Sequence, residues 1–126
     1  MKFHYNYQYD PPAPFVELTL INSNEMLRTN LLSAMVDTGA DNTIVPISYL
    51  EDIGVPQTME RFIRTQWGDR HPVGLYLVDV KIGDLTLPSI DVVGDEWADE
   101  LIVGRDILNR LRLLSDGPQK IITITE

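Results

Sequence analysis

Turn signals recur along the whole chain and divide it into short apolar segments. Clusters of proline, glycine, asparagine and aspartate separate these segments, most of which are too short for a stable helix. Segments of this length between turn residues are typical of β-strands. We therefore predict a mostly β fold, with strands over residues 3–9, 15–21, 31–36, 42–45, 62–66, 73–82, 85–93 and 120–125.

Helical patterns are confined to two places. Residues 46–53 fit a short helix that ends before Gly54 and Pro56. Residues 105–112 fit a helix better, because Ile107, Leu108 and Leu111 fall on one face. The predicted architecture is thus mostly β with one short C-terminal helix.

Length and composition limit the size and the chemistry of the protein. The chain has 126 residues, and we assign residues 1–126 to a single domain. Hydrophobic residues make up 44%, which is enough for a core without covalent cross-links. The absence of cysteine excludes disulfides, thiolate nucleophiles and cysteine-based zinc sites. The sequence shows no ligand cluster, so no metal and no cofactor is expected.

Charge and hydropathy indicate where the protein works. The formal net charge of −9 argues against nucleic acid as a partner, because no basic patch is available to neutralise phosphates. No apolar stretch approaches the roughly 18 residues that suggest a membrane span, and residues 1–10 lack the pattern of a secretion signal. We therefore expect a cytoplasmic protein without membrane contact.

The triplet Asp37-Thr38-Gly39 follows directly on a predicted buried strand. Two carboxylates roughly 3 Å apart can hydrolyse a peptide bond, because charges that close cannot both ionise and one carboxyl keeps its proton. Gly39 would let the backbone turn and leave room for a substrate chain, and the Thr38 hydroxyl would hold the loop by a local hydrogen bond. Alternatively, such a triplet is an ordinary turn that closes a strand.

Two motifs together resemble the retropepsins, the single-domain aspartic peptidases typified by retroviral proteases. In that family the active-site loop follows an apolar strand as Asp-Thr/Ser-Gly-Ala, which here begins at Asp37 and ends at Ala40. The second family signature is an apolar pair, then Gly, Arg and Asp or Asn at the start of a helix. Here it comprises residues 102–106 and ends in Gly104, Arg105 and Asp106. The resemblance covers residues 15–125 and implies a closed β-barrel-like acid-protease fold.

The resemblance also implies roles for individual residues. Asp37, Thr38 and Gly39 would form the catalytic loop, with Gly104, Arg105 and Asp106 supporting it from behind. Arg105 would pair with Asp41, although a solvated charge at a helix start is the alternative. Residues that would contact the substrate are Met35, Ala40, Asp41, Asn42, Ile44 and Ile102, and the apolar ones among them fit an ordinary core equally well.

A hairpin flap over the substrate is a further implication of the resemblance. We place its tip within residues 66–72, with Trp67 and Gly68 as substrate contacts, although a core tryptophan is an equal alternative. The loop 95–100 falls where the family has a substrate-facing loop. Its acidity predicts a preference for basic residues near the cleavage site.

The chain contains one Asp-Thr/Ser-Gly triplet, at Asp37, whereas the hydrolysis of a peptide bond by carboxylates needs two of them. A C2 homodimer would place Asp37 beside its own copy across the axis. The terminal segments 3–9 and 120–125 are candidates to complete the interface, and simple edge strands of a single chain are the alternative. The predicted function is therefore an aspartic endopeptidase that acts on peptide or protein substrates as a homodimer. The alternatives are a catalytically weak or inactive dimerisation or peptide-binding module with the same fold, and an unrelated small β-barrel binding domain.

Overall fold

The computed structural model describes residues 1–64, 67–97 and 99–125, which form strands and two short helices. None of the helices in these ranges has the length and apolar character needed to cross a membrane. The elements in chain order are β1 (Lys2–His4), β2 (Phe15–Asn22), β3 (Leu27–Arg28), β4 (Leu32–Val36), β5 (Ile44–Pro46), α1 (Ile47–Asp52), β6 (Gln57–Arg64), β7 (Arg70–Ile82), β8 (Leu85–Asp95), β9 (Ile102–Val103), α2 (Arg105–Leu108), β10 (Arg112–Asp116) and β11 (Ile121–Thr125).

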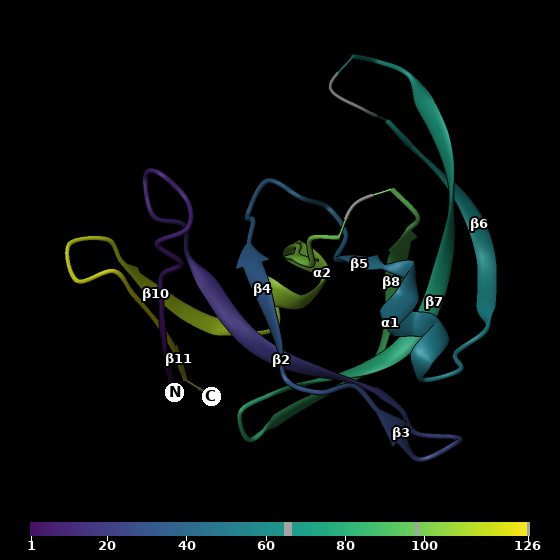
Figure 1. Cartoon of the computed structure of the whole chain (residues 1–126), viewed down its shortest axis with the longest axis horizontal. Helices are drawn as coiled ribbons and strands as arrows, with labels where there is room; N and C mark the ends of the chain where they lie inside the picture. The colour runs from purple at the N-terminus through teal and green to yellow at the C-terminus, as the bar shows by residue number, and fades with distance from the viewer. Residues whose placement is uncertain (65–66, 98, 126) are drawn as a thin grey trace.

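The larger sheet closes on itself as a six-stranded barrel. Its strands follow one another in the order β2-β4-β9-β5-β8-β7, and β7 returns to pair with β2 between Thr19↔Lys81 and Ile21↔Asp79. Strands β3 and β6 are attached outside this ring, and β6 with β7 forms the hairpin that projects from the barrel in Figure 1. The prediction of a mostly β, closed barrel is confirmed.

Buried and exposed side chains alternate along the strands, and the buried ones fill the barrel. On β2, Leu18 and Leu20 are fully buried, whereas Glu17, directly before Leu18, is exposed. The helices add Leu50 from α1 and Ile107 from α2 to the same core. Each such side chain removed from water contributes about 1.5–3 kcal/mol, so the barrel forms a firm support for the loops at its ends.

The two termini form a separate three-stranded sheet in the order β1-β11-β10, and they lie side by side in Figure 1. The predicted strand 3–9 is wrong beyond His4. After β1 the chain folds back, so that Asn6 pairs with Ala13 in an isolated bridge. Prolines within this loop cannot donate to a strand ladder, which explains why the aromatic alternation does not continue as a strand.

The prediction of one C-terminal helix over residues 105–112 needs correction. Helix α2 comprises only Arg105–Leu108, and α1 lies in the middle of the chain, where the shorter helical pattern was found. Arg112 already pairs with Thr125 at the start of β10. The ladder between β10 and β11 satisfies main-chain groups that a longer helix would have used, although Leu111 still packs against the core.

Candidate active site

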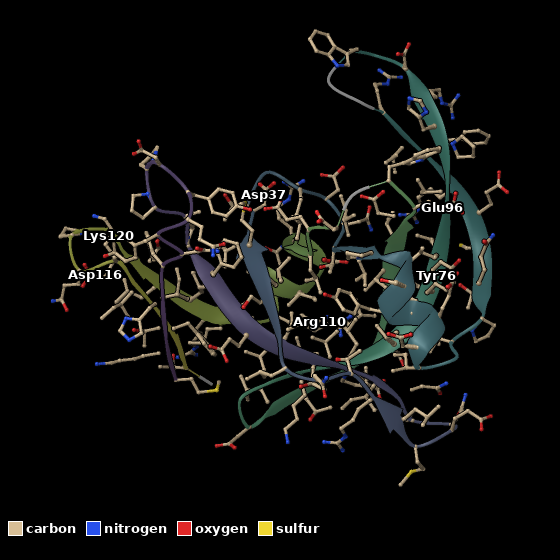
Figure 2. All side chains as sticks on the ribbon, viewed as in Figure 1. Asp37, Tyr76, Glu96, Arg110, Asp116 and Lys120 are labelled. Atoms are coloured by element: carbon tan, nitrogen blue, oxygen red, sulfur yellow. The ribbon has the colours of Figure 1, made fainter. Side chains whose placement is uncertain are left out.

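Asp37 occupies the first position after β4, where the chain leaves the barrel. Its main-chain N–H donates to the carbonyl of Val103 at 3.0 Å, which anchors the loop to β9. Its carboxylate Oδ1 accepts the N–H of Gly39 at 2.9 Å, and its carbonyl accepts the N–H of Ala40 at 3.2 Å. The half-buried carboxylate is therefore held in one orientation on the side of the barrel from which the hairpin rises (Figure 2).

At Gly39 the constraint is limited space beside Asp37 rather than a left-handed backbone. It is not among the glycines with positive φ, but a Cβ built on it would lie 3.3 Å from Oδ1 of Asp37. Thr38 is exposed, and its hydroxyl makes no hydrogen bond within the described ranges. The expected local hydrogen bond of this hydroxyl is thus not formed, and the group faces solvent.

Gly104 allows the second motif to lie directly behind the Asp37 loop. A Cβ at this position would come within 2.6 Å of the carbonyl carbon and oxygen of Asn42 and within 2.9 Å of the carbonyl oxygen of Ala40. Contacts below 3.0 Å require the backbone to shift, so only glycine fits there. The next residue, Arg105, donates its main-chain N–H to Ala40 at 2.9 Å and completes the contact.

The Arg105 side chain binds the Asp37 loop at two points. Nη1 donates to the carbonyl of Thr38 at 2.9 Å, and Nη2 forms an ion pair with Asp41, so the expected pair is present. Asp41 is 82% exposed, and solvent therefore screens the charge attraction. The value of this arrangement lies in its fork geometry, which fixes the loop relative to α2.

Thr43 is a buried residue of this site that the sequence did not single out. Its hydroxyl donates to Oδ1 of Asp106 at 2.7 Å and accepts the main-chain N–H of Gly104 at 3.1 Å. Oδ2 of Asp106 accepts the N–H of Thr43 at 3.0 Å. Thr43 stands between Asn42 and Ile44, directly before β5, so the sequence gives no distinct signal for its burial.

Strand β9 brings three of the expected apolar residues into register. Met35 on β4 pairs with Ile102, and Ile102 pairs with Ile44 on β5. All three are partly buried, so they line the edge of the barrel beside Asp37 without belonging to its deepest core. Asn42 packs its main chain on Gly104.

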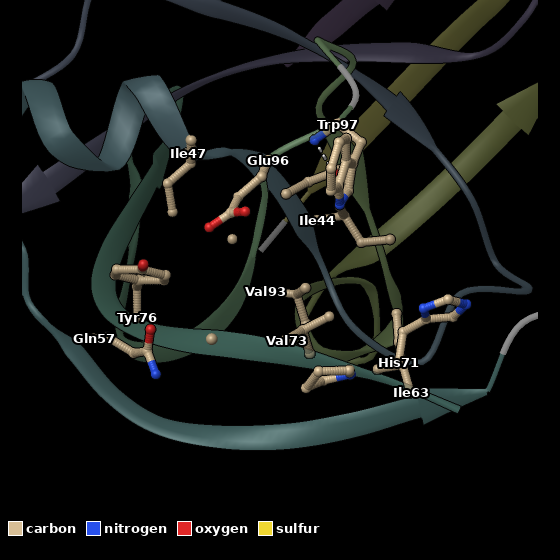
Figure 3. A pocket seen from close by; sticks show the side chains of 14 residues that line it. Ile44, Ile47, Gln57, Ile63, His71, Val73, Tyr76, Val93, Glu96 and Trp97 are labelled. Atoms are coloured by element: carbon tan, nitrogen blue, oxygen red, sulfur yellow. Dashed lines mark hydrogen bonds between the residues drawn. The ribbon is translucent and has the colours of Figure 1, made fainter. Parts of the chain in front are cut away.

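A cavity of about 660 Å³ lies between the β6–β7 hairpin and the barrel (Figure 3). Of the predicted substrate-binding residues, Ile44 lines it. The others do not: Met35, Ala40, Asp41, Asn42, Trp67, Gly68 and Ile102. The residues that sequence reasoning missed come from α1, the hairpin and β8: Ile47, Gln57, Ile63, Val73, Gly74, Tyr76, Val93 and Gly94. A volume of this size is typical of ligand sites.

Tyr76 and Glu96 are among the polar residues that line the cavity. Burial, followed by the negative charges of Glu96 and Glu51, raises the pKa of the Tyr76 phenol above its usual value of 10.0. The hydroxyl therefore remains a hydrogen-bond donor at neutral pH. Glu96 belongs to the acidic loop, whose first residues 95–97 line the cavity.

The turn at the end of the hairpin contains fewer residues than predicted, because β7 begins within the predicted tip. Strand β7 begins at Arg70, so that His71 pairs with Ile63 and Pro72 with Phe62. The turn contains Trp67, which is 80% exposed and therefore not a core residue. Residues 65 and 66 of the predicted strand 62–66 lie outside the described residues, and residue 66 also belongs to the predicted tip.

The arrangement supplies one half of an acid–base pair. A fixed carboxylate can accept a proton from water, but hydrolysis of an amide also needs a proton donor at the carbonyl oxygen. Within the described ranges, the neighbouring carboxylates Asp41 and Asp106 are occupied by Arg105 and Thr43. For hydrolysis of an amide, the second group would therefore have to come from elsewhere.

Known structures of retropepsin-like proteins have the same fold. A retropepsin-like aspartic protease from Rickettsia conorii superimposes with a TM-score of 0.64 at 17% identity, covering 97% of this chain and 86% of that one. EIAV protease in complex with the inhibitor HBY-793 gives 0.59 at 18% identity, with 86% and 93% covered. The retroviral protease-like domain of Ddi1 from Leishmania major gives 0.58 at 24% identity, with 90% and 89% covered.

Sequence comparison identifies the family directly. No curated protein sequence matches the chain significantly. Residues 27–110 match the sequence profile of the gag-polyprotein aspartyl proteases, and this segment contains both motifs. The chain therefore belongs to the gag-polyprotein aspartyl protease family and has the retropepsin-like fold.

Proposed function

We propose that the protein is an aspartic endopeptidase whose active site forms between two copies of the chain. The observation that carries this proposal is the fixed carboxylate of Asp37, held by the N–H of Gly39 at the end of β4. Each chain offers one such group, and the chemistry needs two. A twofold axis beside Asp37 supplies the second, because symmetry brings identical residues together there.

The exposed Thr38 hydroxyl supports a contact across this axis. It has no partner within the described chain, and it stands next to the catalytic carboxylate. In a dimer it donates to the loop of the second copy. The fork of Arg105 holds both loops in place, so the distance between the two carboxylates is set by rigid elements.

Hydrolysis follows from one proton shared by the two Asp37 carboxyl groups. The ionised carboxylate takes a proton from water, and the water oxygen bonds to the scissile carbonyl carbon. The protonated carboxyl gives its proton to the carbonyl oxygen, which yields a tetrahedral diol. Proton transfer to the leaving nitrogen then breaks the C–N bond and releases an acid and an amine.

The cavity beneath the β6–β7 hairpin supports a peptide as substrate. Its apolar wall, which includes Ile44 and Val93, receives side chains of an extended chain that runs past Asp37. The hairpin acts as a flap that covers the peptide and excludes water. Its outer strand β6 pairs only with β7 among the described strands, which leaves the hairpin free to bend toward the substrate.

Cleavage of a mixed peptide library between about pH 3 and 8 tests this function. Wild type is expected to cleave with a bell-shaped pH dependence, because the pair must hold one proton. Asp37→Asn is expected to abolish cleavage. Asp91→Asn is the matched control, since it removes an exposed aspartate on β8, and it should cleave like wild type.

Two results would reject the peptidase. Cleavage by Asp37→Asn at the wild-type rate would exclude the carboxylate pair. The absence of cleavage by wild type, from a preparation shown to be folded and dimeric, would favour the binding-module alternative.

A further inference from the structure

We propose that the cavity beneath the hairpin selects a lysine or arginine side chain of the substrate, with Glu96 as the specificity-determining residue. This inference rests on the proposed function, because it assigns a substrate class to the same site.

A pair of glycines opens the floor of the cavity. Gly74 on β7 and Gly94 on β8 lie directly opposite each other in the sheet. A Cβ on Gly94 would lie 2.5 Å from the ring of Tyr76, and one on Gly74 would lie 2.6 Å from Oε1 of Gln57. Larger residues would push these side chains into the space, so the glycines keep the cavity deep.

Glu96 places an unneutralised carboxylate in the wall of this space. Glu96 is exposed, and no described residue forms a hydrogen bond or an ion pair with it. The carboxylate and the Tyr76 ring face the same space in Figure 3, with Ile47 beside them. The remaining acidic group there, Asp95, accepts the main-chain N–H of Trp97 at 2.9 Å.

The apolar surface and the negative charge of the cavity together suit a long cationic side chain. The methylene stem of lysine or arginine packs well against apolar residues while its charged end reaches a polar group. Here Ile47 and Val93 offer the apolar surface, and Glu96 offers the charge. The Trp97 ring, 94% exposed at the rim, adds an aromatic face that attracts cations. One of the lining side chains is basic: His71, which also lies on the rim.

The cavity lies close enough to Asp37 to bind a substrate side chain near the scissile bond. Ile44, in its wall, belongs to β5, which is separated from β4 by β9 alone. Two strand spacings amount to roughly 10 Å. An extended peptide advances about 3.3 Å per residue, so a side chain that enters the cavity at Ile44 stands within about three residues of the scissile bond.

Binding measured without hydrolysis tests the inference. Fluorescently labelled octapeptides with a central apolar pair, carrying arginine, lysine or norleucine at each flanking position in turn, are titrated with the Asp37→Asn dimer. At one position arginine or lysine should bind about tenfold more tightly than norleucine, as expected for a partly solvated charged hydrogen bond. Adding Glu96→Gln should reduce the difference below about twofold. Adding Asp99→Asn, in the same loop but outside the cavity wall, should preserve it.

The outcomes separate this inference from the peptidase function. Equal affinity for basic and norleucine peptides, a preference that persists in Glu96→Gln, or no binding of any peptide would overturn the selection of a basic side chain. Cleavage by the protein with Asp37 intact is scored independently. Cleavage without basic preference leaves the peptidase standing, and basic preference in binding without cleavage leaves the cavity assignment standing.

Discussion

At the scale of single residues, one buried hydroxyl joins the two motifs of the site. Thr43 is fully buried, and its hydroxyl lies between Oδ1 of Asp106 and the N–H of Gly104. Neither motif contains this residue. The Asp37 loop and the start of α2 therefore depend on a side chain with no chemical role of its own.

Thr43→Val keeps the shape of the side chain and removes the hydroxyl. The buried N–H of Gly104 then loses its acceptor, which should lower the free energy of unfolding by about 1–3 kcal/mol. Urea denaturation measures the change. Thr86→Val is the control, because Thr86 is exposed and its hydroxyl has no bond within the described chain, so it should change stability by less than about 0.5 kcal/mol. Equal effects of the two variants would contradict the role of Thr43.

At the scale of elements, the site is a close contact between a loop and the start of a short helix. The chain passes from β9 into α2 directly behind residues Ala40 and Asn42, with Gly104 at the nearest point. The position of Asp37 is therefore set by elements that are far away in sequence.

Gly104→Ala is expected to disturb this contact. The added methyl group would overlap the main chain of Asn42, and the resulting shift should lower the free energy of unfolding by about 1–3 kcal/mol and weaken peptide cleavage. Denaturation and cleavage assays on one preparation measure both. Gly117→Ala is the control, because a Cβ there meets nothing within 4 Å and its φ is not positive. A Gly104→Ala protein as stable and active as the control would refute the close contact.

The sequence predicted the elements that have local signals. Alternation and turn residues located β2, β4, β7 and β8 to within a few residues, and the two motifs located the Asp37 loop and Gly104. Strand β9 was missed because its two residues are hidden within the second motif and become a strand only by pairing with β4.

Other features arise only from tertiary packing. The pairing of Thr19 with Lys81, which closes the barrel, joins segments far apart in the chain and has no local signature. The cavity is likewise built from distant parts, since Tyr76, Gly94 and Ile47 meet only after β7, β8 and α1 have packed. The extra length predicted for α2 failed because the ladder with β11 outweighs local helical preference.

At the scale of the whole molecule, charge opposes the proposed assembly. Each chain carries a formal charge of −9, so a dimer carries twice that, or −18. Repulsion between exposed charges is screened over about 10 Å at 0.1 M salt and about 3 Å at 1 M. Sedimentation should therefore show tighter dimers as salt rises. A dimer that weakens with salt would indicate attraction between charged groups across the interface.

The central claim is that one active site needs Asp37 from two chains. Wild type and Asp37→Asn, mixed at constant total protein and allowed to exchange subunits, test it most directly. If only dimers with two aspartates cleave peptides, activity follows the square of the wild-type fraction, and an equal mixture retains about one quarter. Activity that falls in simple proportion, to about one half in the equal mixture, would show that each chain works alone and would contradict the account.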